Sequence, residues 1–248
     1  MELVSELAGA VSRGEIAAVF QPQIDVGSGQ VVAVEALARW NHPELGLVRP
    51  DTFIPLAEET GLIAEIGDFM LDEGCRCASE WNSSGHRIEV AVNVSAAQLA
   101  SVDFIDRVRV DIEHYRLSAD NLIIEITESL PVPEAPDVLS RLVELGRLGL
   151  NISVDDFGTG HSSVARLLAL PVNELKLDQS LVQAQHTPDS LTEAIAIAKD
   201  KGLRIVAEGV ETEVQFERAR DLGCDRAQGY YFGRPTSEEQ ITRLLAEA

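Results

Sequence analysis

Cysteine and histidine are scarce in this sequence, and their scarcity excludes several kinds of site. The chain has three cysteines, Cys75, Cys77 and Cys224, and five scattered histidines. A small, odd number of cysteines excludes a disulfide framework and predicts a reducing, cytoplasmic compartment. Because Cys75 and Cys77 lie two positions apart on an expected helix, they do not share a face. We interpret them as buried thiols rather than as a zinc-binding pair.

Basic residues and long apolar runs are also lacking. The chain has 20 Lys and Arg residues against 41 Asp and Glu residues, which gives a formal net charge of -21. This balance disfavours polymeric nucleic acid as a partner, since nucleic acids recruit basic surfaces. It does not exclude a small phosphorylated ligand, because bound metal ions can invert the sign of a local site. No apolar run approaches the roughly 18 residues of a membrane-spanning helix, so we expect no membrane segment in this chain.

What the sequence does contain is a series of short apolar runs that alternate with helical segments. Its 248 residues are 45% hydrophobic without linker composition, so we expect one domain over residues 1–248. Strands are expected at 18–24, 31–38, 88–94, 122–127, 151–155, 174–177, 204–208 and 225–228. Helices are expected at 3–13, 50–59, 63–81, 103–116, 137–149, 163–170, 189–201 and 212–221, with Gly14 closing the first segment.

This alternation predicts an α/β fold of the TIM (β/α)8 barrel type. An open doubly wound sheet is the alternative, but its glycine-rich dinucleotide fingerprint is missing. The first two strands are joined through Gly27-Ser28-Gly29. A turn this short predicts an antiparallel hairpin at the start of the barrel.

Several of the expected strands end on a polar side chain, and a barrel gathers such strand ends at one mouth. The oxygen-bearing candidates are Glu35, Asn93, Glu125, Asp155, Asp156, Glu208 and Glu211. Hard oxygen donors suit magnesium or manganese, and two ions that share one carboxylate would offset the repulsion among the acids. A single acid at a strand end is more often a helix cap or a rim ion pair, but that explanation does not suit a whole set.

Two basic residues and one loop complete the candidate site. Lys176 lies between Leu175 and Leu177, an unusual place for a cation unless it points into a polar mouth. There it would orient a nucleophilic water or neutralise phosphate charge, and an ion pair with a neighbouring acid is a compatible alternative. Arg39 is expected beyond the end of its strand, where it could grip a phosphate, although taken alone it resembles a surface arginine. The glycines of residues 155–163 are typical of a mobile loop, or of an ordinary strand-to-helix loop.

These residues stand within a series of ordered motifs. In chain order the motifs are FQPQID, VEALARW, FIPLAEETGLI, AVNVSAAQL, IEITES, VDDFGTGHSS, LKLD, VAEGVET and QGYYFGRP. From about residue 15 to about residue 236, the chain resembles the EAL family of cyclic di-GMP phosphodiesterases, whose naming motif stands here as Glu35-Ala36-Leu37. The resemblance implies a modified TIM barrel with an antiparallel first strand, in agreement with the predicted hairpin.

The resemblance also implies roles for individual residues. One metal ion would be held by Glu35, Asn93, Glu125 and Asp155, and a second by Asp155, Asp156 and Glu208, with Asp155 bridging. Lys176 would position the attacking water, and the catalytic set would be Lys176, Glu208, Glu35 and Asp155. Substrate contacts would come from Gln21, Leu37, Arg39 and Gln228. The lid loop and its supporting residues would be Glu128, Gly158, Thr159, Gly160 and Glu211.

The activity that the resemblance implies is hydrolysis of cyclic di-GMP to linear pGpG with two Mg2+ or Mn2+ ions, and with Ca2+ inhibitory. A homodimer is expected, and a longer parent protein could carry sensor or cyclase domains.

Two positions depart from the family pattern, because His161 replaces the usual tyrosine in the lid loop and Gln23 replaces a common apolar residue. A receptor that binds cyclic di-GMP without cutting it is the alternative, although such members usually lack a ligand and this chain lacks none. A purely protein-interacting barrel is a third interpretation.

Overall fold

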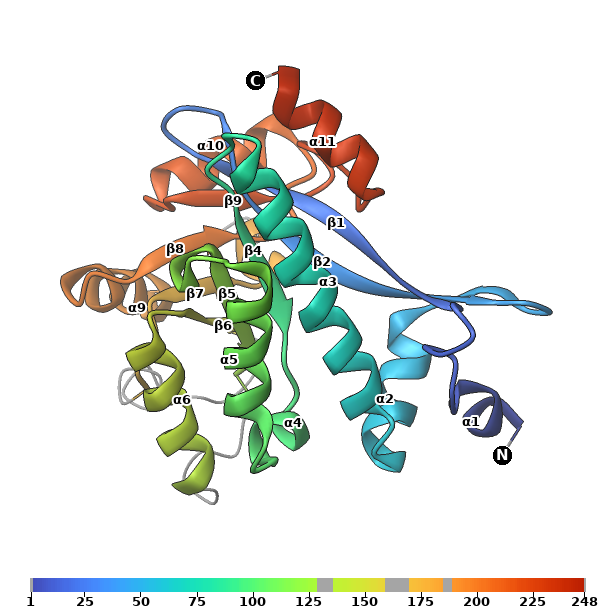
Figure 1. Cartoon of the computed structure of the whole chain (residues 1–248). Helices are drawn as coiled ribbons and strands as arrows, with labels where there is room; N and C mark the ends of the chain where they lie inside the picture. The colour runs from blue at the N-terminus through green and yellow to red at the C-terminus, as the bar shows by residue number, and fades with distance from the viewer. Residues whose placement is uncertain (1, 129–135, 159–169, 185–188, 248) are drawn as a thin grey trace.

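The computed structural model describes residues 2–128, 136–158, 170–184 and 189–247 (Figure 1). In these ranges, eight strands form a barrel in the order β1-β9-β8-β7-β6-β5-β4-β2, and β1 pairs with β2 to close it. They are β1 (Ile16–Asp25), β2 (Val31–His42), β4 (Glu89–Asn93), β5 (Leu122–Thr127), β6 (Asn151–Phe157), β7 (Glu174–Leu177), β8 (Arg204–Ala207) and β9 (Arg226–Gln228). Only β1 runs antiparallel to its barrel neighbours. The predicted modified barrel with an antiparallel first strand is therefore confirmed.

The first two strands are longer than the barrel requires. β2 pairs with β1 as far as Trp40, whereas its pairing with β4 ends at Ala36. Beyond that point the two strands leave the barrel as a ribbon, to which β3 (Gly46–Val48) adds a short hairpin (Figure 1). The sequence predicted that Arg39 lies beyond the end of its strand, and this prediction is wrong. Arg39 lies inside β2, because β1 continues to pair with β2 there. Glu35 lies where β2 leaves the barrel.

Helices cover the outside of the barrel, and most of the expected ones are present. These are α2 (Pro50–Thr60), α3 (Ile63–Ser83), α5 (Phe104–Tyr115), α6 (Pro136–Leu148), α9 (Asp189–Asp200) and α10 (Glu213–Asp221). The described helices that were not expected are α4 (Ala96–Ala100), the 3-10 helix η1 (Ala119–Asn121), α8 (Gln179–Gln183) and α11 (Glu238–Glu247). None of the helices described is long and apolar enough to cross a membrane.

Of the remaining two expected helices, one is shorter than predicted and the other lies almost wholly outside the described residues. The first, α1 (Glu2–Leu7), ends before Gly14, because Gly9 adopts the left-handed conformation with a φ of 74°. An α-helix cannot continue through that conformation. The helix expected at 163–170 lies outside the described residues except for its last position.

The α3 helix shows how the outer layer packs on the barrel. A Cβ at Gly74 would come within 2.6 Å of Val92 Cγ2, so glycine permits close contact between this helix and β4. Cys75 and Cys77 on the same helix, and Cys224 after α10, are free and buried, as predicted. Burial raises the pKa of the Cys75 and Cys224 thiols to about 12, so these thiols stay protonated at neutral pH.

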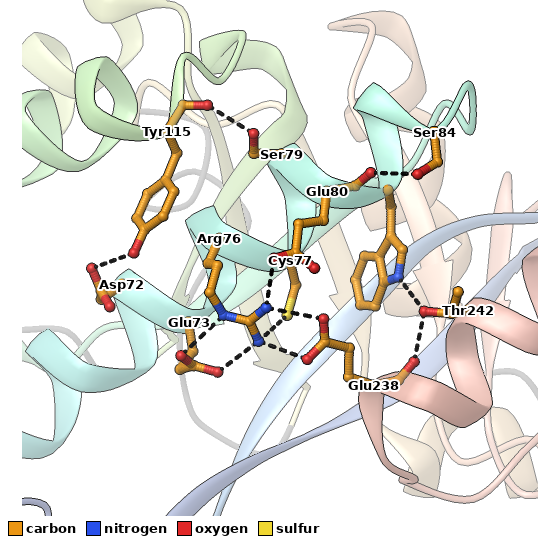
Figure 2. A network of polar contacts seen from close by, with 11 residues as sticks. Asp72, Glu73, Arg76, Cys77, Ser79, Glu80, Ser84, Tyr115, Glu238 and Thr242 are labelled. Atoms are coloured by element: carbon orange, nitrogen blue, oxygen red, sulfur yellow. Dashed lines mark hydrogen bonds and ion pairs between the residues drawn. The ribbon is translucent and has the colours of Figure 1, made fainter.

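A polar network attaches the C-terminal helix α11 to α3 (Figure 2). The Arg76 guanidinium donates to Glu238 at 2.6 and 3.0 Å, and to Glu73 at 3.0 and 3.2 Å. Beside this pair, Trp81 Nε1 donates to Thr242 Oγ1 at 2.9 Å. The chain end after the barrel is therefore fixed to the outer layer by directional contacts.

An ion-pair network closes the N-terminal mouth of the barrel. Its members are the first residues of four strands, namely Glu89 of β4, Glu174 of β7, Arg204 of β8 and Arg226 of β9. Arg204 lies 2.5 Å from Glu174 and 3.1 Å from Glu89, and Arg226 pairs with Glu89 as well. The charged side chains at this mouth are thus paired with one another, and the predicted functional residues lie at the opposite, C-terminal mouth.

Candidate active site

Polar side chains from seven strands meet at the C-terminal mouth of the barrel. They are Glu35 of β2, Asn93 of β4, Glu125 of β5, Asp155 of β6, Lys176 of β7, Glu208 directly after β8 and Gln228 of β9. The structure brings these predicted residues together, because the parallel strands of a barrel end at the same mouth.

Lys176 occupies the centre of this cluster. Its side chain is fully buried, and Nζ lies 2.8 Å from Glu208, 3.0 Å from Glu125, 3.2 Å from Asp155 and 3.4 Å from Glu35. Because successive side chains of a strand alternate in direction, Lys176 points into the barrel while its apolar neighbours in β7 face the helices. One ammonium group therefore faces four carboxylates.

The charges at this centre shift one another's pKa. Burial alone would lower the pKa of Lys176, but the carboxylates hold it well above its ordinary value, so the ammonium stays charged. Burial raises the pKa of Glu125 well above its usual range, and the Glu35 charge adds to the shift. Burial also raises the pKa of Glu208, although Lys176 opposes it. Acids held in this way are stabilised as anions by any further cation.

Amide side chains hold Glu35 in place. Burial would raise the pKa of Glu35, but Lys176 and the amide donors bring it below its ordinary value. Gln228 Nε2 donates to one carboxylate oxygen at 2.6 Å, and Asn93 Nδ2 donates to the other at 2.8 Å. Gln228 accepts in turn from Gln23 Nε2 at 2.9 Å. Gln23 is one of the two departures from the family pattern. It positions Gln228, and Gln228 in turn positions Glu35.

The acids form two groups of a size that suits metal ions. The first is Glu35, Glu125 and Asp155, the second is Asp155, Asp156 and Glu208, and the ligand atoms of each group lie within 4.8 Å of one another. Asp155 belongs to both groups, as a bridging ligand does. Glu125 is fully buried, and its Oε1 lies 3.0 Å from the Lys176 ammonium, whereas its Oε2 accepts no hydrogen bond from the described residues. A buried carboxylate oxygen without a donor fits a hard divalent cation.

The backbone turns Asp156 toward the mouth. Its φ is 59°, in the left-handed region, and it lies at an irregularity in the pairing of β6 with β7. Bulges of this kind re-aim side chains, and the conformation costs on the order of 1 kcal/mol in a residue other than glycine. Asp156 N donates to Asp155 Oδ1 at 2.9 Å, which holds the two aspartates relative to each other. Burial, with the Asp155 charge, raises the pKa of Asp156.

Glu128 supports the start of the predicted lid loop. Its Oε2 accepts a hydrogen bond from Gly158 N at 2.8 Å, and its own backbone N donates to Asp155 O at 3.0 Å. Gly158 has a φ of 103°, and a Cβ there would come within 2.4 Å of Leu181 Cδ1, so the position requires glycine. The rest of the predicted loop, Thr159, Gly160 and His161, lies outside the described residues.

Two pockets open beside the acid cluster. The pocket of about 310 Å3 is lined by Gln21, Gln228 and Glu211 among others, and the pocket of about 270 Å3 is lined in part by Arg39. Leu37 lines both of them. The residues predicted to contact substrate therefore lie on both sides of the acids.

Some residues at this mouth were not singled out from the sequence. Asp178, Gly209 and Tyr230 line the larger pocket. All three follow the ends of strands, where no periodic pattern marks which side chains turn toward the mouth. For Tyr230, the available signal was its place two residues after Gln228 in the motif QGYYFGRP.

This chain resembles known proteins along nearly its whole length. The sequence profile of the EAL domain matches residues 4–235. The bifunctional diguanylate cyclase/cyclic di-GMP phosphodiesterase MucR of Pseudomonas aeruginosa is 41% identical over 251 residues, which cover 99% of this chain and 37% of MucR. The cyclic di-GMP phosphodiesterase PA2567 of the same organism is 37% identical over 248 residues, covering 98% of this chain and 42% of PA2567.

Solved structures agree with the sequence comparison. The structure of the MucR phosphodiesterase in complex with c-di-GMP matches with a TM-score of 0.90 at 41% identity, and the match covers 97% of this chain and 100% of that one. The curated relatives are longer, and this chain spans about a third of the length of MucR and of the Escherichia coli oxygen sensor protein DosP (37% and 30%).

Proposed function

Because this chain belongs to the EAL domain family, we propose that it is a metal-dependent phosphodiesterase that hydrolyses cyclic di-GMP to linear pGpG. The observation that carries the proposal is the buried Lys176 among four carboxylates, which together with Asp156 form two acid groups that share Asp155. The names of MucR and PA2567 and the cyclic di-GMP complex of MucR support the substrate. Such a reaction would lower the level of this second messenger in bacterial signalling.

We assign a divalent cation to each acid group. Glu35, Asn93, Glu125 and Asp155 would hold one, and Asp155, Asp156 and Glu208 the other. Both sets offer oxygen ligands, which suit Mg2+ or Mn2+, whereas the larger and more loosely coordinated Ca2+ is expected to inhibit. The ions would supply Lewis acidity at the phosphate and a lower pKa for a water molecule.

Lys176 provides a fixed hydrogen-bond donor for the reaction. Since its raised pKa keeps it protonated, it orients the attacking water and does not remove a proton from it. The water oxygen forms the new bond to phosphorus, the bond from phosphorus to the 3′-oxygen of the sugar breaks, and that oxygen takes up a proton from solvent to become the 3′-hydroxyl of pGpG. The proton of the water passes to a carboxylate of the cluster, for which Glu208 is suited by its raised pKa and by its distance of 2.8 Å from Lys176 Nζ.

The two pockets would hold the two halves of the dinucleotide. Gln21 and Gln228 line one pocket, Arg39 lines the other, and Leu37 lies between them. Arg39 is half-buried and would face phosphate charge as a planar cation. The lid loop and its supports would be Glu128, Gly158, Thr159, Gly160 and Glu211.

The wider setting is also a proposal. We expect residues 1–248 to act as one cytoplasmic domain that forms a homodimer. The greater length of the relatives, and the cyclase named in MucR, support a parent protein with sensor or cyclase domains.

Turnover of cyclic di-GMP by the purified chain tests this function. The linear product would be followed by chromatography in Mg2+, Mn2+, Ca2+ or chelator, with Lys176→Ala beside the wild type. We expect pGpG in Mg2+ or Mn2+, none in chelator, and a loss of about 100-fold or more in the variant. Saturable binding of the intact dinucleotide without product would make the chain a receptor instead. The absence of both product and binding would indicate a protein-interacting barrel.

A further inference from the structure

Tyr230 is an exposed aromatic residue at the rim of the larger pocket. It follows β9 by two residues, its exposed fraction is 51%, and it lines the same pocket as Glu208 and Gln228. The neighbouring Tyr231 differs, because its ring packs against Phe216 and Phe232. Tyr230 makes no ring-to-ring contact within the described part of the chain.

The backbone beneath Tyr230 is fixed. Gly229 packs so closely on Val210 that a Cβ would come within 2.1 Å of the Val210 carbonyl oxygen. Val210 N donates to Gln228 O, and Tyr231 N donates to Val210 O, each at 3.0 Å. Tyr230 is therefore presented by a rigid turn that is tied directly to the site residue Gln228.

One cationic side chain lies on the Tyr230 ring, and a second is near enough to interact with its phenol electrostatically. The Arg234 guanidinium lies over its ring, with Cζ 4.1 Å from the ring centroid, which is within the range of a cation–π contact. On the barrel side, burial lowers the pKa of Arg39, and the Tyr230 phenol is close enough to oppose that shift. One face of the ring is thus covered by a cation, and half of the residue is open to solvent.

An aromatic ring held in this way suits a purine. Base–aromatic stacking contributes to nucleotide binding with little dependence on hydrogen bonds, because every base has a π-face. A guanidinium on the opposite face withdraws electron density from the ring and favours stacking with an electron-rich base. Tyrosine also loses little conformational entropy when it is immobilised, since it has two rotatable side-chain bonds.

We propose that Tyr230 is a substrate-binding residue on which one guanine base of cyclic di-GMP stacks, with Arg234 supporting the ring from behind. This inference rests on the proposed function for the identity of the ligand. It assigns to Tyr230 a role in affinity and in selection for a purine, and no role at the acid cluster.

The test compares Tyr230→Ala and Tyr230→Phe with Tyr231→Ala, a matched change at the next position. KM and kcat are measured for cyclic di-GMP, and the rate is also measured for methyl p-nitrophenyl phosphate, a diester without a purine. We expect Tyr230→Ala to raise KM for cyclic di-GMP about 10-fold or more, with a much smaller effect on kcat and on the small diester. Tyr230→Phe keeps the ring and should stay close to wild type.

Several results would overturn the inference. They are an unchanged KM in Tyr230→Ala, an equal loss on both substrates, a loss in Tyr230→Phe as large as in Tyr230→Ala, or an equal rise of KM in Tyr231→Ala. If the wild type proves inactive, the proposed hydrolysis fails. The stacking on Tyr230 is then tested by calorimetry, which compares the Kd for cyclic di-GMP in Ca2+ between the wild type and Tyr230→Ala. A weaker Kd in Tyr230→Ala would then support the inference. An unchanged Kd, or no binding by the wild type, would overturn it.

Discussion

Lys176 is the residue on which the electrostatics of the mouth depend. Its ammonium lies within 3.4 Å of an oxygen of each of four carboxylates, and its side chain is fully buried. Breaking a buried ion pair by removing one partner is costly, because the remaining charges keep their desolvation penalty and lose their compensation. One cation against four acids also leaves an excess of negative charge that divalent ions would balance.

Lys176→Met should therefore destabilise the metal-free protein. We expect the free energy of unfolding in chelator at pH 7 to fall by about 3 kcal/mol, measured by urea denaturation. The deficit should shrink as the pH is lowered, because Glu125 and Glu208 have raised pKa values in the folded state and take up protons there first. Lys201→Met, at an exposed position, is the control and should change the stability little. Equal stability of both variants would contradict this account of Lys176.

At the scale of elements, α11 is attached to the outer layer by the Arg76 network (Figure 2). Hydrogen bonds from Arg76 hold the pKa of Glu238 below its ordinary value. A carboxylate with a depressed pKa stabilises the fold above its unfolded pKa and loses that contribution as the pH falls through the folded value. The contact between Arg76 and Glu238 is therefore expected to weaken in acid.

Glu238→Gln tests this attachment. At pH 7 we expect a loss of about 1 kcal/mol, reduced from a fully buried pair by the partial exposure of both side chains, and faster hydrogen exchange in α11. The difference from wild type should begin to shrink as the pH falls below about 4.5, the ordinary pKa of a glutamate, and should vanish below the lowered pKa of Glu238 in the folded state. Glu247→Gln, on the same helix but exposed, is the matched control. Unchanged exchange in α11 at pH 7 in Glu238→Gln would refute the role of the pair.

The ion pairs at the opposite mouth make a prediction of the same kind. Glu174→Gln removes a fully buried carboxylate that lies 2.5 Å from Arg204, and leaves Arg204 with Glu89 as its acidic partner in this network. We expect the free energy of unfolding to fall by about 2 kcal/mol in urea denaturation. Glu217→Gln, which breaks the exposed pair with Arg220, should cost less than about 0.5 kcal/mol. A smaller effect for Glu174 than for Glu217 would show that the pairs do not seal the barrel.

The sequence predicts those elements that depend on their own pattern of apolar residues, and it misses those that depend on contacts with other segments. Buried strands such as β5 and β8 are nearly continuous apolar runs, so their positions were predicted within a residue. The extension of β2 past Ala38 to His42 depends on pairing with β1 and β3 rather than on its own pattern, and it was missed. The early end of α1 depends on the backbone conformation of Gly9, which the sequence does not specify.

At the scale of the whole molecule, the two ends of the barrel differ in chemistry. One mouth is filled by Glu89, Glu174, Arg204 and Arg226, and the other gathers acids around Lys176. The site residues were predictable because a polar side chain at the end of a buried strand departs from the surrounding pattern. Gln23 and Tyr230 were not assigned a role, because their places depend on a side-chain hydrogen bond and on a turn.

The central claim is that the acid groups sharing Asp155 carry out metal-dependent cleavage of cyclic di-GMP. Its most direct test is the rate of pGpG formation as Mn2+ is titrated into metal-free wild type and Asp155→Asn. We expect the wild-type rate to rise from zero to saturation, and the variant to stay at least about 1000-fold slower at every Mn2+ concentration, because both acid groups lose their shared ligand. Wild-type turnover in chelator, or a variant that reaches the wild-type rate, would contradict the account.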